Sequence, residues 1–112
     1  MQTSKVKELI KTGVSLAPMA GITDYVLRSL VRKYSTDSLI TTEMISSELL
    51  AQTLKGRSGT EILKRDENHS PISYQISGHK PELMKLAAQT LSPLADMIDI
   101  NMGCPVPKVV NP

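Results

Sequence analysis

The chain has a single cysteine, Cys104, and this scarcity excludes several kinds of protein. One thiol cannot form an internal disulfide, and no second thiol is available to complete a cysteine metal site. A reducing cytoplasm is therefore the expected compartment. The two histidines, His69 and His79, lie in polar stretches where we expect them to be solvated, with no metal ligands nearby. The sequence accordingly predicts no metal site.

Aromatic residues and long apolar runs are also scarce. The 112 residues include three tyrosines but neither tryptophan nor phenylalanine, so the core must be aliphatic. No apolar run approaches the roughly 20 residues of a membrane-spanning helix, and residues 1–11 lack the apolar centre of a signal peptide. Because neither feature is present, we expect no membrane partner.

The net charge of +2 is well short of the strong basic stripe that by itself indicates a nucleic-acid-binding protein.

What the sequence does contain is an alternation of strand-like and helix-like stretches. Four short runs rich in apolar and β-branched residues are expected to be strands, near residues 14–18, 38–42, 71–76 and 96–101. Three stretches with apolar residues at helical spacing lie between them, at residues 23–34, 44–55 and 81–91. Residues 56–70 are a polar connection that has room for a helical turn.

The stretch 23–34 has the clearest amphipathic pattern. Its apolar residues recur at helical spacing and are expected to face the core: Val26, Leu27, Leu30, Val31 and Tyr34. Arg28 and Arg32 fall on the other face, which we expect to meet solvent. Thr23 or Asp24 would cap the start of this helix.

The other two helices also carry start signals. Ser46 or Ser47 would cap the helix at 44–55. Pro81 suits the first turn of the third helix, because its missing N–H would be unpaired there in any case. The apolar side of that helix is expected to consist of Leu83, Leu86, Ala87 and Leu91.

Alternating strand and helix units predict an α/β fold with a parallel sheet. A doubly wound sheet and a (β/α)₈ TIM barrel both give this pattern, and two features favour the barrel. No G-x-G-x-x-G turn follows the first strand. Each strand also ends in a polar or conformationally special cluster, "PMAG", "TTEM", "YQISG" or "NMGCP", and a barrel builds its active site at these ends. A full barrel takes roughly 250 residues, so about four parallel strands would be its N-terminal half.

Taken singly, most of these clusters have an ordinary structural explanation. Residues 18–21 could form a simple strand-to-helix turn. Glu43 could be a solvated carboxylate or a favourable charge at a helix N-terminus. Gln75 is less ordinary, because a buried amide in the middle of a strand needs hydrogen-bond partners. A lone Cys104 is more often an inert core thiol than a reactive one.

Taken together and in order, "APMAGITD", "TEMIS", "YQISG" and "DINMGCPVPKVV" closely resemble the tRNA-dihydrouridine synthase family. The resemblance covers nearly the whole chain, and "DINMGCP" followed by Lys108 is its most specific part. It implies an FMN-containing (β/α)₈ barrel with a C-terminal helical domain. Such an enzyme takes electrons from NADPH through the flavin and reduces a specific uridine of tRNA to 5,6-dihydrouridine.

The resemblance also implies roles for individual residues. Pro18, Met19 and Ala20 match the loop whose backbone touches the flavin, and Gln75 matches the amide at the edge of the isoalloxazine ring. Asn101 matches the residue that orients the target uracil, and Cys104 matches the catalytic acid. The thiol suits this role because an ordinary thiol, with a pKa of about 8.5, is mostly protonated at neutral pH.

Two departures from the family accompany the resemblance. Lys80 precedes Pro81 where the family has an acidic or small polar cap, so we expect a weaker helix start. The resemblance also implies that residues 1–112 are the N-terminal portion of one FMN-binding barrel domain. The C-terminal half of that barrel, with its phosphate-binding loops, and the helical tRNA-binding domain would then be absent. We therefore expect the chain alone to be inactive.

Two other readings stay open at this stage. The chain could belong to another FMN-dependent barrel oxidoreductase, similar to dihydroorotate dehydrogenase, although "DINMGCP" argues against it. It could also be a non-catalytic half-barrel fragment. In that case the unpaired edge of its fourth strand would favour self-association.

Overall fold

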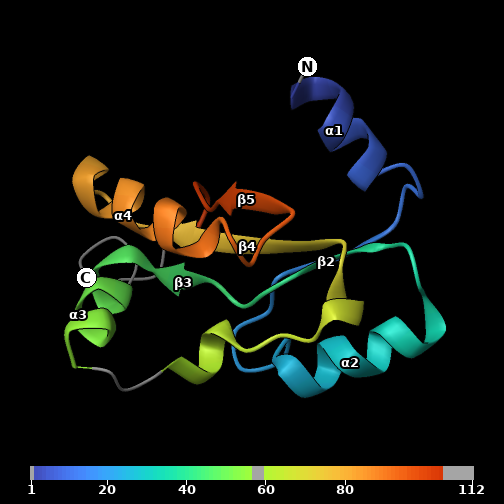
Figure 1. The fold of residues 1–112 in the computed structure, drawn as a ribbon, viewed down its shortest axis with the longest axis horizontal. Helices are drawn as coiled ribbons and strands as arrows, with labels where there is room; N and C mark the ends of the chain where they lie inside the picture. The colour runs from blue at the N-terminus through green and yellow to red at the C-terminus, as the bar shows by residue number, and fades with distance from the viewer. Residues whose placement is uncertain (1, 57–59, 105–112) are drawn as a thin grey trace.

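The computed structural model describes residues 2–56 and 60–104 of the chain, so Lys108 of the resemblance lies outside the described residues. The elements, in chain order, are α1 (Gln2–Leu9), β1 (Ser15–Leu16), α2 (Tyr25–Tyr34), β2 (Leu39–Thr41), β3 (Ile45–Ser46), α3 (Ser47–Gly56), η1 (Thr60–Leu63), η2 (Glu67–His69), β4 (Ile72–Ser77), α4 (Pro81–Leu91) and β5 (Met97–Ile100). Figure 1 shows β4 running through the middle of the molecule, with α1 set apart near the N-terminus.

The strands form one parallel sheet, as the alternating pattern predicts. β1 pairs with β2, β2 with β4, and β4 with β5, so the four predicted strands lie in sequential order. The α/β class is confirmed, and the arrangement is that of part of a (β/α)₈ barrel.

The fifth strand, β3, was not predicted, because the sequence indicated only a helix in residues 44–55 with Ser46 or Ser47 as its cap. Ile45 pairs with Ile76 along the edge of β4 that β2 also uses, so β2 and β3 form one interrupted strand. The helix begins at Ser47, and Ser46 caps it as predicted, since its hydroxyl oxygen accepts from the N–H of Leu49 at 3.3 Å. A two-residue strand is too short to leave a periodicity in the sequence.

The core lies on the helix-facing side of the sheet. Ile72, Tyr74 and Ile76 of β4 are fully buried and pack in one cluster with side chains of the three intervening helices. These helical side chains include Val31 of α2, Leu50 of α3, and Ala87 and Leu91 of α4. The helices between the strands therefore cover one face of the sheet, as in a barrel. Because side chains alternate along a strand, Ser73, Gln75 and Ser77 point to the opposite face.

The predicted orientation of α2 is only partly right, because Val31 packs against the core as expected but Val26, Leu30 and Tyr34 are exposed. Arg28 and Arg32 are buried, with 1% and 4% of their surfaces exposed, whereas Val26 and Tyr34 are 71% and 86% exposed. The guanidinium groups reach carbonyl oxygens that apolar side chains could not satisfy. Arg28 donates to the Thr23 and Lys64 carbonyls at 2.7 and 2.8 Å. The cap prediction holds, because Asp24 accepts from the N–H of Leu27 at 2.9 Å.

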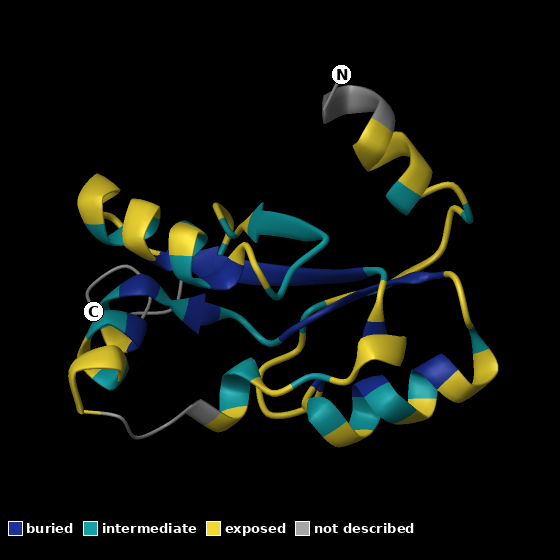
Figure 2. Ribbon diagram, viewed as in Figure 1, coloured by how far each residue is buried: buried dark blue, intermediate teal, exposed yellow. Residues whose placement is uncertain are grey.

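Figure 2 shows how unevenly the helices are buried, with α1 exposed over most of its described length. In α4, Pro81 occupies the first turn, and Lys80 makes no side-chain capping bond, as the sequence predicts. Leu86 is 41% exposed and so does not join the buried face expected for it. No helix in the described ranges combines the length and the apolar character needed to cross a bilayer.

The two histidines have different environments. His79 is about half exposed and lies 3.2 Å from the Glu48 carboxylate. The prediction for His69 is wrong, because its side chain is fully buried beneath α2. Its Nε2 atom lies 2.8 Å from the Ser29 hydroxyl oxygen, and its ring packs 5.1 Å from that of Tyr25. The polar sequence around His69 reflects the 3₁₀ turn, not the position of the imidazole.

Candidate active site

The candidate residues gather at the carboxyl-terminal ends of the strands, where the connecting loops of a barrel form its site. Gln75 lies near the end of β4, and only 6% of its surface is exposed. Its side chain points away from the helix-facing core, as a ligand-binding role requires. The N–H of Gln75 donates to the Thr42 hydroxyl at 3.2 Å, so the loop after β2 supports this part of β4.

A row of hydrogen bonds joins three of the predicted residues and adds a fourth. The Nε2 atom of Gln75 donates to an Asp99 carboxylate oxygen at 2.6 Å. The Nδ2 atom of Asn101 donates to Gln75 Oε1 at 3.2 Å. The Oδ1 atom of Asn101 accepts from the backbone N–H groups of Gly103 and Cys104 at 3.0 and 2.9 Å. We call this row the amide relay.

The amide relay follows from the register of β4 and β5. Gln75 is the pairing partner of Asp99, and Asn101 lies two residues further on, on the same face as Asp99. The N–H of Asn101 donates to the Ile76 carbonyl at 2.9 Å and continues the pairing past the end of β5. Two strands thus bring three polar side chains together beside the half-buried Cys104.

The loop at residues 18–21 is fixed by a different set of contacts. The N–H of Met19 donates to the Thr23 hydroxyl at 3.1 Å, and Gly21 has a φ of +72°. The N–H of Gly21 donates to the Glu43 carboxylate at 2.5 Å. Glu43 therefore joins the loops that follow β1 and β2, which neither of its ordinary interpretations anticipates. Pro18 is half-buried, whereas Met19 and Ala20 are exposed.

The structure thus divides the predicted site residues into two groups. The amide relay connects Gln75, Asn101 and Cys104 directly. Residues 18–20 belong to the loop that Glu43 holds, and no hydrogen bond among the described residues links them to Gln75. Sequence reasoning missed Asp99, although a carboxylate two residues before Asn101 in a strand places both on one face.

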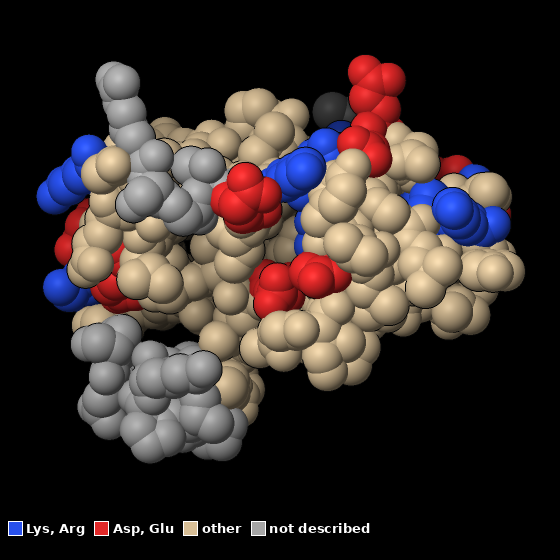
Figure 3. Space-filling model, turned by 90° about the horizontal axis from the view of Figure 1, so that it is seen from below, with Lys and Arg blue, Asp and Glu red and all other residues tan. Residues whose placement is uncertain are grey.

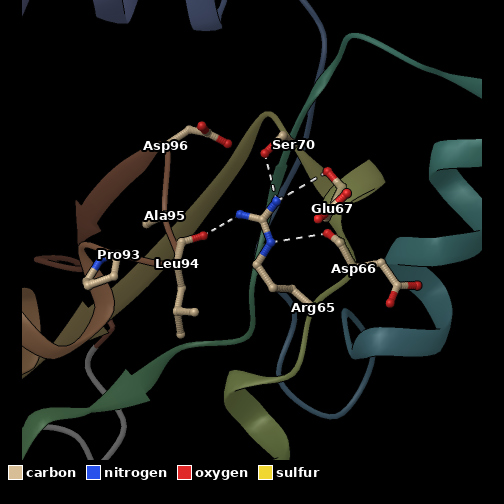
Figure 4. Close-up of a pocket in the computed structure, with 8 residues that line it drawn as sticks. All are labelled: Arg65, Asp66, Glu67, Ser70, Pro93, Leu94, Ala95 and Asp96. Carbon is tan, nitrogen blue, oxygen red and sulfur yellow. Dashed lines mark hydrogen bonds between the residues drawn. The ribbon is translucent and has the colours of Figure 1, made fainter.

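Two hollows of the described part lie away from the amide relay. One, of about 420 Å³, is lined by residues before β4 and β5, at the amino-terminal ends of the strands. Figure 4 shows the Arg65 guanidinium spanning it, with hydrogen bonds to the Ser70 hydroxyl at 2.7 Å and to the Leu94 carbonyl. The Arg65 guanidinium already donates its hydrogen bonds to oxygen atoms of the protein. We therefore interpret this hollow as a structural junction and not as a ligand site.

A second hollow, of about 310 Å³, lies between α2 and η1 beside Glu43.

Figure 3 shows acidic and basic side chains interspersed over the face seen from below, so positive charge does not dominate that face. Among the described residues, no three His, Cys, Asp or Glu side chains are grouped as metal ligands.

Comparison with known proteins gives consistent results. The family model "Dihydrouridine synthase (Dus)" matches residues 15–112. The chain is 37% identical over 94 residues to probable tRNA-dihydrouridine synthase 1 of Synechocystis, covering 83% of this chain and 26% of that protein. It is 38% identical over 103 residues to the probable tRNA-dihydrouridine synthase of Helicobacter pylori, covering 90% and 30%.

A third relative is tRNA-dihydrouridine synthase B of Pseudomonas aeruginosa, which is 40% identical over 97 residues. That match covers 86% of this chain and 28% of the relative. The chain therefore spans less than a third of the length of these relatives.

Proposed function

Since the chain belongs to the dihydrouridine synthase family, we propose that it forms the N-terminal part of a cytoplasmic enzyme that reduces a uridine of tRNA to 5,6-dihydrouridine. The observation that carries this proposal is the amide relay, which brings Gln75 and Asn101 beside the Cys104 loop. Reduction of the uracil C5–C6 bond requires a hydride at C6 and a proton at C5. The chain's residues are suited to positioning the base and supplying the proton.

Open hydrogen-bonding groups at this end of the sheet support the binding of an FMN ring. Gln75 uses one N–H and one lone pair in the amide relay, and its amide has a second of each. Within the described residues, the N–H of Ala20 has no hydrogen-bond partner. A Cβ placed on Gly103 would meet nothing within 4 Å, so the backbone there is open to a ligand.

Pro18, Met19, Ala20 and Gln75 would hold the flavin ring in this proposal. When bound, FMN supplies the hydride for C6 after it has taken electrons from NADPH. The protein's part is to orient the ring and the base, and to exclude alternative positions. The amide of Gln75 suits this because its buried side chain is held by two hydrogen bonds.

Asn101 would orient the uracil through the single donor that the amide relay leaves available. Its Oδ1 atom accepts from two N–H groups, and one N–H of Nδ2 donates to Gln75. The second N–H of Nδ2 would therefore donate to a uracil carbonyl oxygen. Cys104, in a loop fixed by the same Asn101, would give its thiol proton to C5.

We expect the activity of the whole protein to require more than this segment, because the chain spans only 26% to 30% of the length of these relatives. We expect the 112-residue chain alone to bind FMN weakly. A bound phosphate needs several convergent N–H groups and charges. The phosphate-binding loops are expected in the other half of the barrel. Without them, the chain should lose several kcal/mol of FMN-binding free energy, roughly a thousandfold in affinity.

The test is to join the 112 residues to the remaining part of the Helicobacter pylori relative and to compare the joined protein with the chain alone. We expect the joined protein to retain flavin absorbance after gel filtration and to raise the dihydrouridine content of unmodified tRNA when NADPH is supplied. The chain alone should do neither. A joined protein that holds flavin but leaves tRNA unchanged would contradict the proposed substrate.

A further inference from the structure

Asp99 is the member of the amide relay to which the proposed reaction assigns no role. It lies in β5 opposite Gln75, and its half-buried carboxylate accepts the 2.6 Å hydrogen bond from Gln75 Nε2. Burying part of a carboxylate costs free energy of hydration unless hydrogen bonds replace the lost water contacts. The hydrogen bond from Gln75 is therefore important for keeping Asp99 at this position.

The two ends of the amide relay differ from its middle in one chemical respect. The side-chain amides of Gln75 and Asn101 carry both donors and acceptors, so either could be turned by 180° without leaving its place. The carboxylate of Asp99 can only accept, and the backbone N–H groups of Gly103 and Cys104 can only donate. An acceptor at one end and donors at the other allow only one direction along the row.

The observed hydrogen bonds follow that direction. Gln75 Nε2 faces Asp99, Gln75 Oε1 faces Asn101 Nδ2, and Asn101 Oδ1 faces the N–H groups of the Cys104 loop. Turning Gln75 would bring its oxygen against the carboxylate and its nitrogen against Asn101 Nδ2. Both contacts would be repulsive, so the carboxylate rejects the turned amide.

We propose that Asp99 is a positioning residue that fixes the orientation of the Gln75 and Asn101 amides and, through them, the loop that carries Cys104. Its consequence for catalysis rests on the proposed function, because the oriented amides are those assigned to the flavin and the uracil. The effect of Asp99 on the orientation of the amides and of the loop can be tested in this chain without flavin or tRNA. The property required of residue 99 is a hydrogen-bond acceptor at this position; a negative charge is not required.

Cys104 provides a direct readout because it is the only thiol in the chain. Asp99→Leu keeps a similar shape but removes the acceptor, whereas Asp99→Asn retains an acceptor that its neighbour Gln75 can use. We expect Asp99→Leu to raise the rate at which Cys104 reacts with 4,4′-dithiodipyridine by about three- to tenfold, the range expected when one hydrogen bond is lost. Asp99→Asn should react within about twofold of the wild type.

Spectroscopy supplies a second readout. In ¹H–¹⁵N spectra of the 112-residue chain, Asp99→Leu should shift the backbone signals of Gly103 and Cys104, which lie at the far end of the amide relay. Asp99→Asn should shift them much less. The matched control is Asp37→Leu, which removes an exposed carboxylate from the loop before β2 and should change neither signal.

The effect should pass through Gln75, and a double variant checks this. Gln75→Leu alone should raise the thiol reaction rate as Asp99→Leu does, and adding Asp99→Leu to it should produce little further change. Additive effects would mean that Asp99 acts on the loop by another route, which would overturn the proposal.

Three other results would also overturn it. The first is a wild-type rate in Asp99→Leu, and the second is an Asp99→Asn rate as high as that of Asp99→Leu. The third is a wild-type rate equal to that of the chain unfolded in urea, because the loop would then not be held. None of these measurements uses flavin or tRNA, so the proposal and the proposed enzyme function fail separately.

Discussion

At the scale of single residues, one buried arginine, Arg32, supports the amino-terminal ends of two strands. Arg32 donates to the carbonyl oxygens of Ser35 and Ser38 before β2, and to those of His69 and Pro71 before β4. Burial lowers the pKa of Arg32 from its ordinary value, although nearby acidic groups oppose the shift. An arginine stays charged under such conditions, because its guanidinium group is a very strong base. Its planar group can therefore satisfy four carbonyls at once.

His69, buried beneath the same helix, is held as a neutral imidazole. The Ser29 hydroxyl donates to the Tyr25 carbonyl at 2.9 Å, so His69 Nε2 must donate to the Ser29 oxygen. His69 Nδ1 is then an acceptor, and it has no hydrogen-bond partner among the described residues. Burial lowers the pKa of His69 below its ordinary value of 6.5, and the nearby positive charge of Arg28 adds to this shift.

This arrangement predicts a pH-dependent stability. Arg28, Arg32 and Arg65 lower the pKa of His69, and Asp66 opposes them. Because the folded pKa lies below the unfolded one, the unfolded chain binds the proton more readily. The contribution of His69 to stability should be complete above pH 6.5 and should be lost as the pH falls through the lowered pKa.

The measurement is the urea midpoint of unfolding between pH 7.5 and 5.5. The wild type should lose more stability over this range than His69→Gln does. The same difference should persist in a His79→Gln background, since that half-exposed imidazole is a separate group. Equal losses with and without His69 would contradict the buried neutral imidazole.

At this scale, the sequence predicted the position of a polar residue correctly when its neighbours in the sequence were apolar. Gln75 stood out because an amide interrupts an apolar strand, and the structure buries it as expected. Arg28 and His69 raised no such conflict, since charged and polar residues on a helix or in a turn usually meet solvent. Only the tertiary structure brings the Lys64 carbonyl near Arg28 and the Ser29 hydroxyl near His69.

At the scale of elements, the junction between β4, α3 and α4 depends on the absence of a side chain at Gly78. A Cβ there would lie 2.0 Å from the Ser47 hydroxyl oxygen and 2.9 Å from the Met84 sulfur. Ser47 is buried at the start of α3, so the hydroxyl has little space to yield. The close approach explains the glycine that ends "YQISG".

Gly78→Ala should therefore destabilise the chain by about 1–2 kcal/mol, the usual cost of adding a methyl group to a packed site. Denaturant unfolding measures this. Gly103→Ala is the matched control, because a Cβ at Gly103 meets nothing within 4 Å. Adding Ser47→Ala to Gly78→Ala should recover part of the loss, and a destabilised Gly103→Ala with a stable Gly78→Ala would contradict the packing described.

The elements themselves were largely predictable. The order of the four main strands follows from alternation alone, because consecutive parallel strands joined by helices pack side by side. The face of α2 was not predictable, since its apolar stripe at Val26, Leu30 and Tyr34 is real but remains exposed in this chain. Periodicity shows that a helix has two faces, and the neighbouring elements decide which face is buried.

At the scale of the whole molecule, the sheet has two open edges in the described part of the chain. β1 pairs only with β2, and β5 pairs only with β4. Unpaired strand edges present free N–H and C=O groups to other chains. We therefore expect the isolated 112-residue chain to self-associate as its concentration rises.

Sedimentation velocity tests this expectation. Ile100, at the end of β5, is 52% exposed, and Ile100→Lys should reduce association because a charge on an edge strand opposes pairing. Leu86→Lys provides the control, because Leu86 is 41% exposed but lies on α4. A chain that is monomeric at every concentration, or one that both substitutions affect equally, would rule out the edge as the contact.

The joined protein described above tests the central claim, that Cys104 supplies the proton in uridine reduction. The most direct measurement compares wild-type and Cys104→Ala proteins under anaerobic conditions in two steps. NADPH should reduce the bound flavin at the same rate in both. Reoxidation of that flavin by unmodified tRNA should be slower in Cys104→Ala by about a hundredfold or more, the usual contribution of a general acid. Equal reoxidation rates in the two proteins would contradict the assignment of Cys104 as the acid.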